Sequence, residues 1–245
     1  MSPRVKRVLF LVLLVIVLFS FLKDSVKDGF VFLSLNCNLL PLYSVVMAFG
    51  WGENFYGKDY CQGLLWAIEF ENEKALLAFV GAGGKLNQQI PYGETPLIIG
   101  VRLLKQTKKI ESRLAFLSLL LKAGADVNYC TRFRETPLLI AVQENLNDQV
   151  IKFLLENGAV ASSTDNKGDA PIHLAGIRGD DNSFRIIEHL VHFGADLNQP
   201  DCLGRNILHY AYALNFSSKR IQDLISLGAN PLQNDKLHCL PQDIK

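Results

Sequence analysis

The feature that most constrains the fold is a sequence layout that recurs about every 34 residues along most of the chain. Similar segments begin at Gln62, Thr95, Thr136, Ala170, Asn206 and Leu240, at intervals of 33, 41, 34, 36 and 34 residues. A nearly constant period of this length indicates that each segment forms one small unit, which cannot bury its apolar face alone. The units are therefore expected to stack in a row.

Each unit reads as two short helices followed by a loop. In the unit at Thr136, the threonine is a good helix-capping residue, and Pro137 sits at the first helical position, where a missing N–H costs nothing. The segment Ile151–Leu155 predicts a second helix, because its apolar residues are spaced by three and four and so share one face. Gly158 then provides the positive φ that suits a helix C-cap.

The motifs at both ends of the units carry a family resemblance. The front ends include ETPLLIA at 135–141, APIHLA at 170–175 and NILHYA at 206–211, and the back ends include GADVN at 124–128 and GADLN at 194–198. In these motifs the chain resembles the ankyrin-repeat family. The resemblance implies an all-α solenoid of helix-turn-helix units with hairpin loops between them, and a surface that binds proteins.

Several positions depart from the repeat pattern. Ala170 lacks the capping hydroxyl, which forfeits about 1 kcal/mol, and Ile207 replaces the proline of the other front ends. The long unit at Thr95 has its extra residues within 105–112, between its two helices. The match at 240–244 is short, and we expect it to cap the array. The glycine-rich stretch at 81–84 falls at a helix end, which favours a C-cap over a phosphate site.

A transmembrane helix is predicted at residues 8–22, which are apolar and carry no charge. The run is shorter than the roughly 20 residues of a typical membrane helix, but Arg7 and Lys23 at its ends can extend to the two surfaces. No small-x-small cleavage pattern follows it, which favours an uncleaved signal-anchor; a cleaved signal peptide, and hence a secreted soluble protein, is the alternative. Residues 30–50 are apolar again, and Pro41 favours cap helices there over a second membrane span.

Charge sets the predicted orientation. Arg4, Lys6 and Arg7 precede the apolar run, whereas acids balance the bases just after it. The positive-inside rule then places the N-terminus in the cytoplasm and the repeats outside it, in the periplasm if the source is bacterial. The expected organisation is a cytoplasmic N-terminus at 1–7, a membrane segment at 8–22, a linker and helical cap at 23–57, and a repeat domain at 58–245.

Few residues suggest catalysis or metal binding. His173 and His209 occupy the same repeat position, so we expect each ring to form hydrogen bonds near a helix start. His189 and His192 lie three residues apart on one predicted helix, but no third ligand at metal spacing accompanies them. The formal charge of +1 argues against a nucleic-acid partner. We expect no enzyme activity, no cofactor, no metal and no small-molecule substrate.

The five cysteines show no C-x-x-C spacing, which disfavours a zinc or redox site. Disulfides are permitted in an extracytoplasmic domain. Cys37 and Cys61 are the candidate pair, since both lie in the N-terminal cap region, and free thiols are the alternative. Cys130 and Cys202 fall in loops two units apart, roughly 20 Å if units stack at about 10 Å, which is beyond bridging range.

By resemblance, partner binding is expected at the loop tips between units and on the exposed face of the first helices. The candidate residues are Tyr92, Arg132, Phe133, Arg134, Lys167, Arg205, Tyr210 and Tyr212. The segment 132–134 is the sharpest candidate, because an exposed aromatic ring between two arginines is typical of interface hot spots. The alternative is that Phe133 packs on the adjacent loop and the arginines are solvated.

Three function classes follow. The first is a protein-interaction module tethered to a membrane, with a protein partner whose identity the sequence does not reveal. The second is an immunity or inhibitor protein that neutralises a toxin or enzyme in the same compartment. The third is an enzyme, which would need a convergent polar cluster that the sequence does not offer.

Overall fold

A computed structural model describes residues 64–243, apart from residues 66, 82, 89–92 and 107–108. The chain divides into two compact units, Met1–Gly84 and Lys85–Lys245. The predicted membrane segment at 8–22, the apolar stretch at 30–50 and the predicted start of the repeats near residue 58 lie outside the described residues. Within the described part of the chain, no helix is both long and apolar enough to cross a membrane.

In the first compact unit, helix α5 (Glu73–Gly81) buries Leu76 and Phe79. The helix ends in the glycine-rich stretch: Gly83 has a φ of 84°, and the Gly84 N–H donates to the Phe79 carbonyl at 3.0 Å. This pattern is a glycine-terminated helix end, because the last carbonyls find donors in the residues that follow. The predicted C-cap is therefore confirmed.

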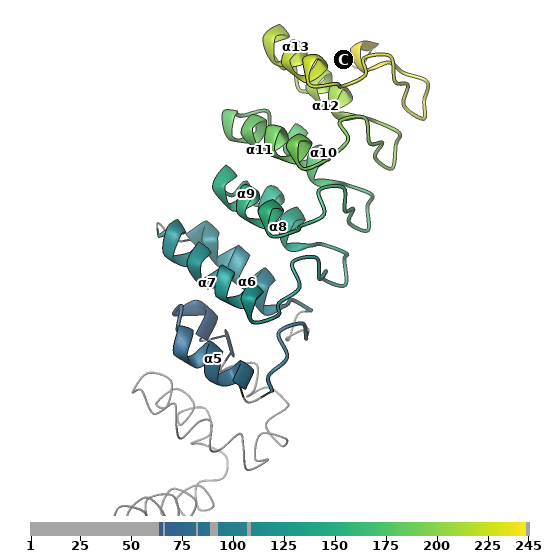
Figure 1. Ribbon diagram of the computed structural model, residues 1–245. Coiled ribbons are helices and arrows are strands. Elements are labelled where there is room, and N and C mark those ends of the chain that lie inside the picture. Colours follow the sequence, from purple (N-terminus) through teal and green to yellow (C-terminus); the bar gives the residue numbers. More distant parts are fainter. Residues whose placement is uncertain (1–63, 66, 82, 89–92, 107–108, 244–245) are drawn as a thin grey trace, which may run out of the picture. The chain divides into compact units, whose positions relative to one another are not determined.

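The second compact unit consists of helix pairs stacked one above another (Figure 1). Its elements are α6 (Pro96–Leu103), η2 (Leu104–Gln106), α7 (Ile110–Lys122), α8 (Pro137–Gln143), α9 (Asp148–Glu156), α10 (Pro171–Gly176), α11 (Asp181–His192), α12 (Ile207–Ala213), α13 (Ser218–Ser226) and η3 (Pro241–Asp243). The first helices pack in the order α6, α8, α10, α12, and α9 packs on α11 in the second layer. In both units, the regular elements of the described residues are helices, and no strand is found among them.

The helix starts follow the predicted capping chemistry. Thr95 and Thr136 accept hydrogen bonds from the N–H groups of Ile98 and Leu139, at 3.4 and 3.2 Å. A proline occupies the first turn of α6, α8 and α10. These caps satisfy donors that a helix leaves without partners in its first turn.

In the units at Ala170 and Asn206, a histidine three residues after the N-cap also bonds back to the helix start. The Nδ1 atom of His173 accepts from the Ala170 N–H at 3.1 Å, and its Nε2 lies 2.7 Å from the Gln199 carbonyl oxygen. His209 Nδ1 accepts from the Asn206 N–H in the same way, at 3.1 Å. Both rings are buried, so the predicted structural role of these histidines is confirmed.

Asparagine side chains join the back ends of neighbouring units. Asn128 donates to the Gly158 carbonyl at 3.0 Å and accepts from the Val160 N–H at 2.9 Å. Asn198 makes the equivalent pair of bonds to the next unit, at 2.9 and 2.6 Å. Ser162 stands at this position in the unit between them, and its shorter side chain lacks the amide that bridges both groups.

The predicted boundary of the long unit's extra residues is wrong by a few residues. The extra residues of the long unit are largely helical: η2 extends α6, and α7 begins at Ile110 rather than after Ser112. In the unit at Ala170, the loop between the two helices ends at Asp180, because α11 begins at Asp181. Asp180 accepts from the Ser183 N–H at 2.7 Å, and this cap starts α11 at once.

The last short match is confirmed as a single turn. Pro241–Asp243 forms the short helix η3, which packs on α12. Pro241 is buried, and the Leu240 N–H donates to the Asp243 carboxylate at 3.3 Å. This turn covers part of the apolar surface of α12.

Candidate protein-interaction surface on the loop tips

Four of the described connecting loops end in hairpins with the same backbone frame: 131–135, 165–169, 201–205 and 235–239. In the second of them, the Asp165 N–H donates to the Asp169 carbonyl at 3.1 Å. The Asp165 carboxylate accepts from the Lys167 and Asp169 N–H groups at 2.8 and 2.9 Å. Such a side chain fixes the turn from inside, because it satisfies donors that the tight bend leaves unpaired.

The fourth position of each hairpin has a positive φ. Gly168 and Gly204 meet this need without strain, with φ of 84° and 82°. Arg134 and His238 adopt the same conformation at 61° and 62°, which is unfavourable for a residue with a Cβ. The hairpin frame thus holds an arginine in a conformation that its own preferences oppose.

Backbone hydrogen bonds tie neighbouring tips together. The Asn166 N–H donates to the Phe133 carbonyl at 3.0 Å, and its side chain donates to the Arg132 carbonyl at 3.2 Å. The Lys236 N–H donates to the Leu203 carbonyl at 2.8 Å. These bonds join the first tip to the second and the third tip to the fourth, and they fix the register within each pair. We call residues 132–134, 166–168, 202–204 and 236–238 the loop-tip row.

The predicted segment 132–134 is exposed at the first tip. The Phe133 side chain is 51% exposed, and the Arg132 guanidinium lies over its ring at 4.7 Å from the centroid. Both arginines are exposed. The described ring contact of Phe133 is therefore with its own hairpin, and half of its surface remains accessible to a partner.

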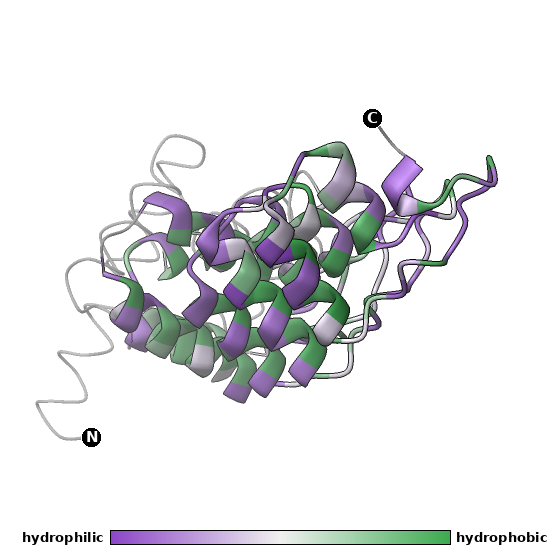
Figure 2. Ribbon diagram, turned by 90° about the horizontal axis from the view of Figure 1, so that it is seen from above, coloured by the Kyte–Doolittle hydropathy of each residue, from purple (hydrophilic) through white to green (hydrophobic). Residues whose placement is uncertain are grey.

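The other tips present residues of two kinds. Lys167 is exposed at the second tip, as the candidate set anticipated. Leu203 and Leu237, at the same hairpin position as Phe133, are 50% and 80% exposed. Neither leucine was among the predicted binding residues, although the repeat register aligns both of them with Phe133. Figure 2 shows the loops projecting from one side of the helices, with hydrophilic and hydrophobic residues alternating along them.

Arg205 and Tyr210 belong to a supporting network below the third tip. The buried Asp201 carboxylate accepts from the Tyr210 hydroxyl at 2.7 Å and from the Arg205 Nε at 2.8 Å. The Arg205 guanidinium also lies 4.7 Å from the centroid of the Tyr210 ring. Tyr210 is buried, with 8% of its surface exposed. The geometry accounts for both residues as supports of the hairpin 201–205.

The charge state of this network is well defined. Burial alone would raise the pKa of Asp201, but hydrogen bonds from Tyr210 and from the backbone and side chain of Arg205 outweigh it and lower that pKa to about 2. Burial, together with the hydrogen bond to Asp201, raises the pKa of Tyr210. At neutral pH the network therefore contains a carboxylate, a neutral phenol and a guanidinium.

Two other candidates are less informative. Tyr212 is half-buried on α12, and its role in binding stays a prediction. Tyr92 lies outside the described residues. The same holds for Cys37 and Cys61, whereas Cys130, Cys202 and Cys239 form no disulfide.

The first-helix edge beside α6 is already neutralised. Arg102 contacts Glu94 at 2.7 Å and Glu144 of the next unit at 3.4 Å, and Lys105 also pairs with Glu144. The charges there satisfy one another across the unit boundary. A charged partner gains less from such an edge than from tips whose bases are solvated.

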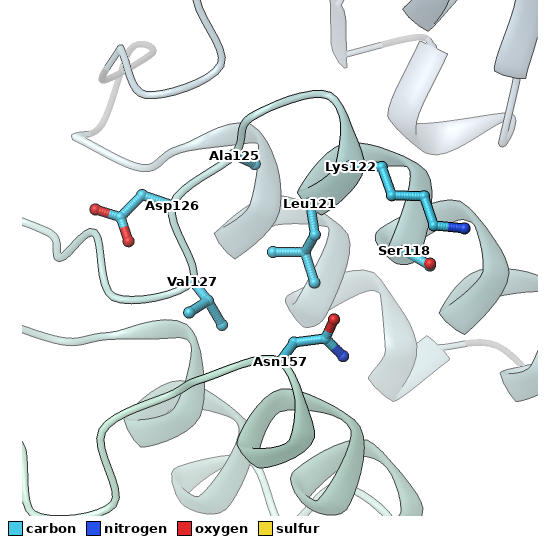
Figure 3. Close-up of a pocket in the computed structure, with 7 residues that line it drawn as sticks. All are labelled: Ser118, Leu121, Lys122, Ala125, Asp126, Val127 and Asn157. Carbon is cyan, nitrogen blue, oxygen red and sulfur yellow. The ribbon is translucent and has the colours of Figure 1, made fainter.

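An open pocket of about 410 Å³ lies between the ends of α7 and α9 (Figure 3). Leu121, Ala125 and Val127 provide its apolar wall. Lys122 and Asp126 point in opposite directions around it, so its polar groups do not converge on one ligand atom. Nor do the described residues contain a group of three or more His, Cys, Asp or Glu placed to hold a metal ion.

Comparison with known proteins agrees with the geometry. Residues 109–201 match the family model described as ankyrin repeats in three copies. The chain is also 32% identical over 172 residues to neurogenic locus notch homolog protein 1 of Cricetulus griseus and of Mus musculus, and 31% identical to that of Homo sapiens. These matches cover 69% of this chain and 6% of each relative's length. With capped helix pairs, glycine helix ends and hairpin loops in register, the stretch at residues 109–201 belongs to the ankyrin-repeat family.

Proposed function

We propose that this protein is a non-enzymatic protein-interaction module, tethered to a membrane by residues 8–22, with its repeats outside the cytoplasm. Ankyrin repeats imply an interaction module in general terms. The tether and the orientation rest on the uncharged apolar run and on the bases that precede it.

The observation that carries the interaction role is the loop-tip row. Its hairpins are braced by their own side chains, and neighbouring tips are joined in pairs by the bonds from Asn166 to Phe133 and from Lys236 to Leu203. Side chains on a braced loop lose little conformational freedom on binding, so more of their contact energy contributes to affinity. Phe133, half-exposed beside two arginines, is the strongest single anchor in the row.

The buried polar network supports a scaffold role for the rest of the unit. Asp201, Arg205 and Tyr210 use their hydrogen-bonding groups on one another and on the hairpin backbone. A catalytic side chain needs a reactive or hydrogen-bonding atom that is directed at a substrate. The polar groups of this network instead stabilise the position of the third tip.

A variant series tests the interaction role. Tagged full-length chain is purified from native membranes with its bound proteins, as wild type and as Phe133→Ala with Arg134→Asn. Asparagine is chosen because it tolerates the positive φ at 134. We expect the variant to lose a partner that the wild type retains, while its melting temperature is nearly unchanged. Equal recovery of every partner by both forms would count against the loop-tip row.

The tether has its own test. Reporter enzymes that are active on one side of the membrane only are fused after Lys245. We expect activity from the extracytoplasmic reporter and retention of the chain in membranes after an alkaline carbonate wash. Activity of the cytoplasmic reporter would contradict the orientation, and release by the wash would favour the cleaved, soluble form.

A further inference from the structure

We propose that the loop-tip row binds an extended, acidic segment of a partner protein that carries apolar residues at intervals set by the repeat spacing. This inference rests on the proposed interaction function and specifies the chemistry of the partner. It is carried by the charge, the exposed apolar residues and the register of the row.

The loop-tip row has a formal charge of +4, although the whole chain has a charge of only +1. Its bases are Arg132, Arg134, Lys167 and Lys236, all exposed, and its twelve residues include no acid. None of the ion pairs among the described residues involves these four bases. They are therefore available to a partner of negative charge.

The acids of the same hairpins lie at the hairpin bases and are engaged there. The carboxylates of Asp165 and Asp235 each accept two N–H groups of their own turn, and Asp201 is buried. Glu135 is half-buried and accepts from the Thr131 hydroxyl at 3.2 Å. The outer ends of the loops are thus positive, while the negative groups lie beneath them.

Apolar side chains alternate with these bases. Phe133, Leu203 and Leu237 all occupy the third position of their hairpins and are at least half exposed. Lys167 holds that position in the second hairpin. A ligand that follows the row meets an apolar contact, a base, and then two further apolar contacts.

The register predicts the spacing in the partner. Stacked helices lie about 10 Å apart, so Phe133 and Leu203, two units apart, are separated by roughly 20 Å. An extended chain advances about 3.3 Å per residue. Matching apolar residues in the partner are therefore about six positions apart for this pair, and about three apart for Leu203 and Leu237, with Asp or Glu between them.

A protein segment fits this surface better than an anionic membrane does. The row is only one hairpin wide, and the half-buried acids Asp169 and Glu135 lie directly below it. A flat anionic membrane would approach those acids as well as the bases, and the repulsion would offset part of the attraction. An extended chain can follow the outer ends alone.

The test uses the full chain in nanodiscs of neutral phosphatidylcholine. Two fluorescein-labelled peptides of about twelve residues are titrated, each with three leucines and with Asp and Glu elsewhere. From the N-terminus, the leucine spacings are about six and then three positions in one peptide, and about three and then six in the other. Fluorescence anisotropy gives the dissociation constant. We expect saturable binding by at least one peptide, weakening as NaCl is raised from about 0.05 to 0.5 M.

Matched variants locate the binding. We expect Arg132→Gln with Lys167→Gln to weaken binding by roughly tenfold, and Phe133→Ser with Leu203→Ser to do the same. The controls are Lys219→Gln and Leu227→Ser, an exposed base and an exposed leucine of α13 and its C-cap. The controls are expected to leave the dissociation constant unchanged. Control peptides are titrated into the wild-type chain, with leucine replaced by serine or with the acids replaced by lysine. They should bind it no better than the original peptides bind the tip variants.

The possible outcomes separate this inference from the proposed function. Binding that the tip variants weaken and the controls do not supports the inference. If neither peptide binds but anionic phosphatidylglycerol vesicles bind through Arg132 and Lys167, the row is a membrane contact and the inference is wrong. If neither peptide binds while a cellular protein is lost from the Phe133 variant, the partner chemistry is wrong and the interaction function stands.

Discussion

At the scale of single residues, Asp201 determines how the third loop tip is held. Its carboxylate is buried and accepts from the backbone N–H groups of Leu203 and Arg205, at 2.7 and 2.9 Å, as well as from two side chains. A carboxylate is well suited to this position, because both of its oxygens accept and neither donates. The exposed Leu203 therefore depends on a buried acid two residues before it.

Asp201→Asn should destabilise the array. The amide nitrogen would face donors from Tyr210 and Arg205, and at least one buried group would lose its partner. We expect the free energy of unfolding to fall by about 1–3 kcal/mol, measured by urea denaturation followed by circular dichroism. Asp223→Asn, at an exposed site on α13, is the control and should change little. Equal effects of the two substitutions would show that the network contributes nothing.

The same residue predicts a pH dependence. The pKa of Asp201 is lowered from 3.8 to about 2 in the folded chain, so the ionised carboxylate favours folding above the unfolded pKa. This contribution is lost as pH falls from about 4 toward 2. The stability difference between wild type and Asp201→Asn should therefore shrink over that range, in urea titrations at several pH values. A constant difference would contradict the assigned pKa.

At the scale of helices and loops, the local features were predictable and the contacts between units were not. Thr95 and Thr136 could be assigned as helix caps because their hydrogen bonds reach only three residues along the chain. The exposure of Leu203 and the burial of Tyr210 depend on where neighbouring loops lie. No periodicity within one unit carries that information.

The candidate segment 132–134 was accessible to sequence reasoning for a similar reason. Two arginines beside an aromatic residue stand out by composition alone. The positive φ of Arg134, by contrast, became visible only in the hairpin frame, since glycine holds the equivalent position in the second and third hairpins. A sequence search for glycine at the fourth hairpin position would therefore not have found Arg134.

His173 tests the contact between a helix start and the next loop. In His173→Leu the Ala170 N–H and the Gln199 carbonyl lose their partners, although leucine fits this position in the unit at Thr136, where it is Leu139. We expect unfolding to become easier by roughly 2 kcal/mol, measured by urea denaturation. His192→Leu, at an exposed site on α11, is the control. A loss no larger than that of the control would mean that the ring contributes through packing alone.

At the scale of the whole array, stability is the sum of the units and of the interfaces between them. The asparagine bridges at Asn128 and Asn198 strengthen two of these interfaces. The interface that follows Ser162 lacks the equivalent side chain. The interface between the pair α8 and α9 and the pair α10 and α11 therefore depends on other bonds, such as those that Asn182 donates to Asn145 and to the Leu146 carbonyl.

Ser162→Asn should supply the bridge that this interface lacks. By analogy with Asn128, the new amide would donate to the Gly194 carbonyl and accept from the Asp196 N–H, adding about 1–2 kcal/mol to the interface. Hydrogen exchange followed by mass spectrometry should show slower exchange in α10 and α11. Ser226→Asn, exposed at the end of α13, is the control. Unchanged exchange in α10 and α11 would show that the bridge does not form.

The central claim is that partners bind the loop-tip row, and site-specific photo-crosslinking in living cells tests it most directly. A photoreactive amino acid is placed in turn at the third hairpin position, residues 133, 167, 203 and 237, and at the exposed ends of the second helices, residues 122, 156, 192 and 226. Our account predicts that the same partner is captured from several loop-tip positions and from none of the helix ends. Capture from the helix ends, with none from the loop tips, would contradict it.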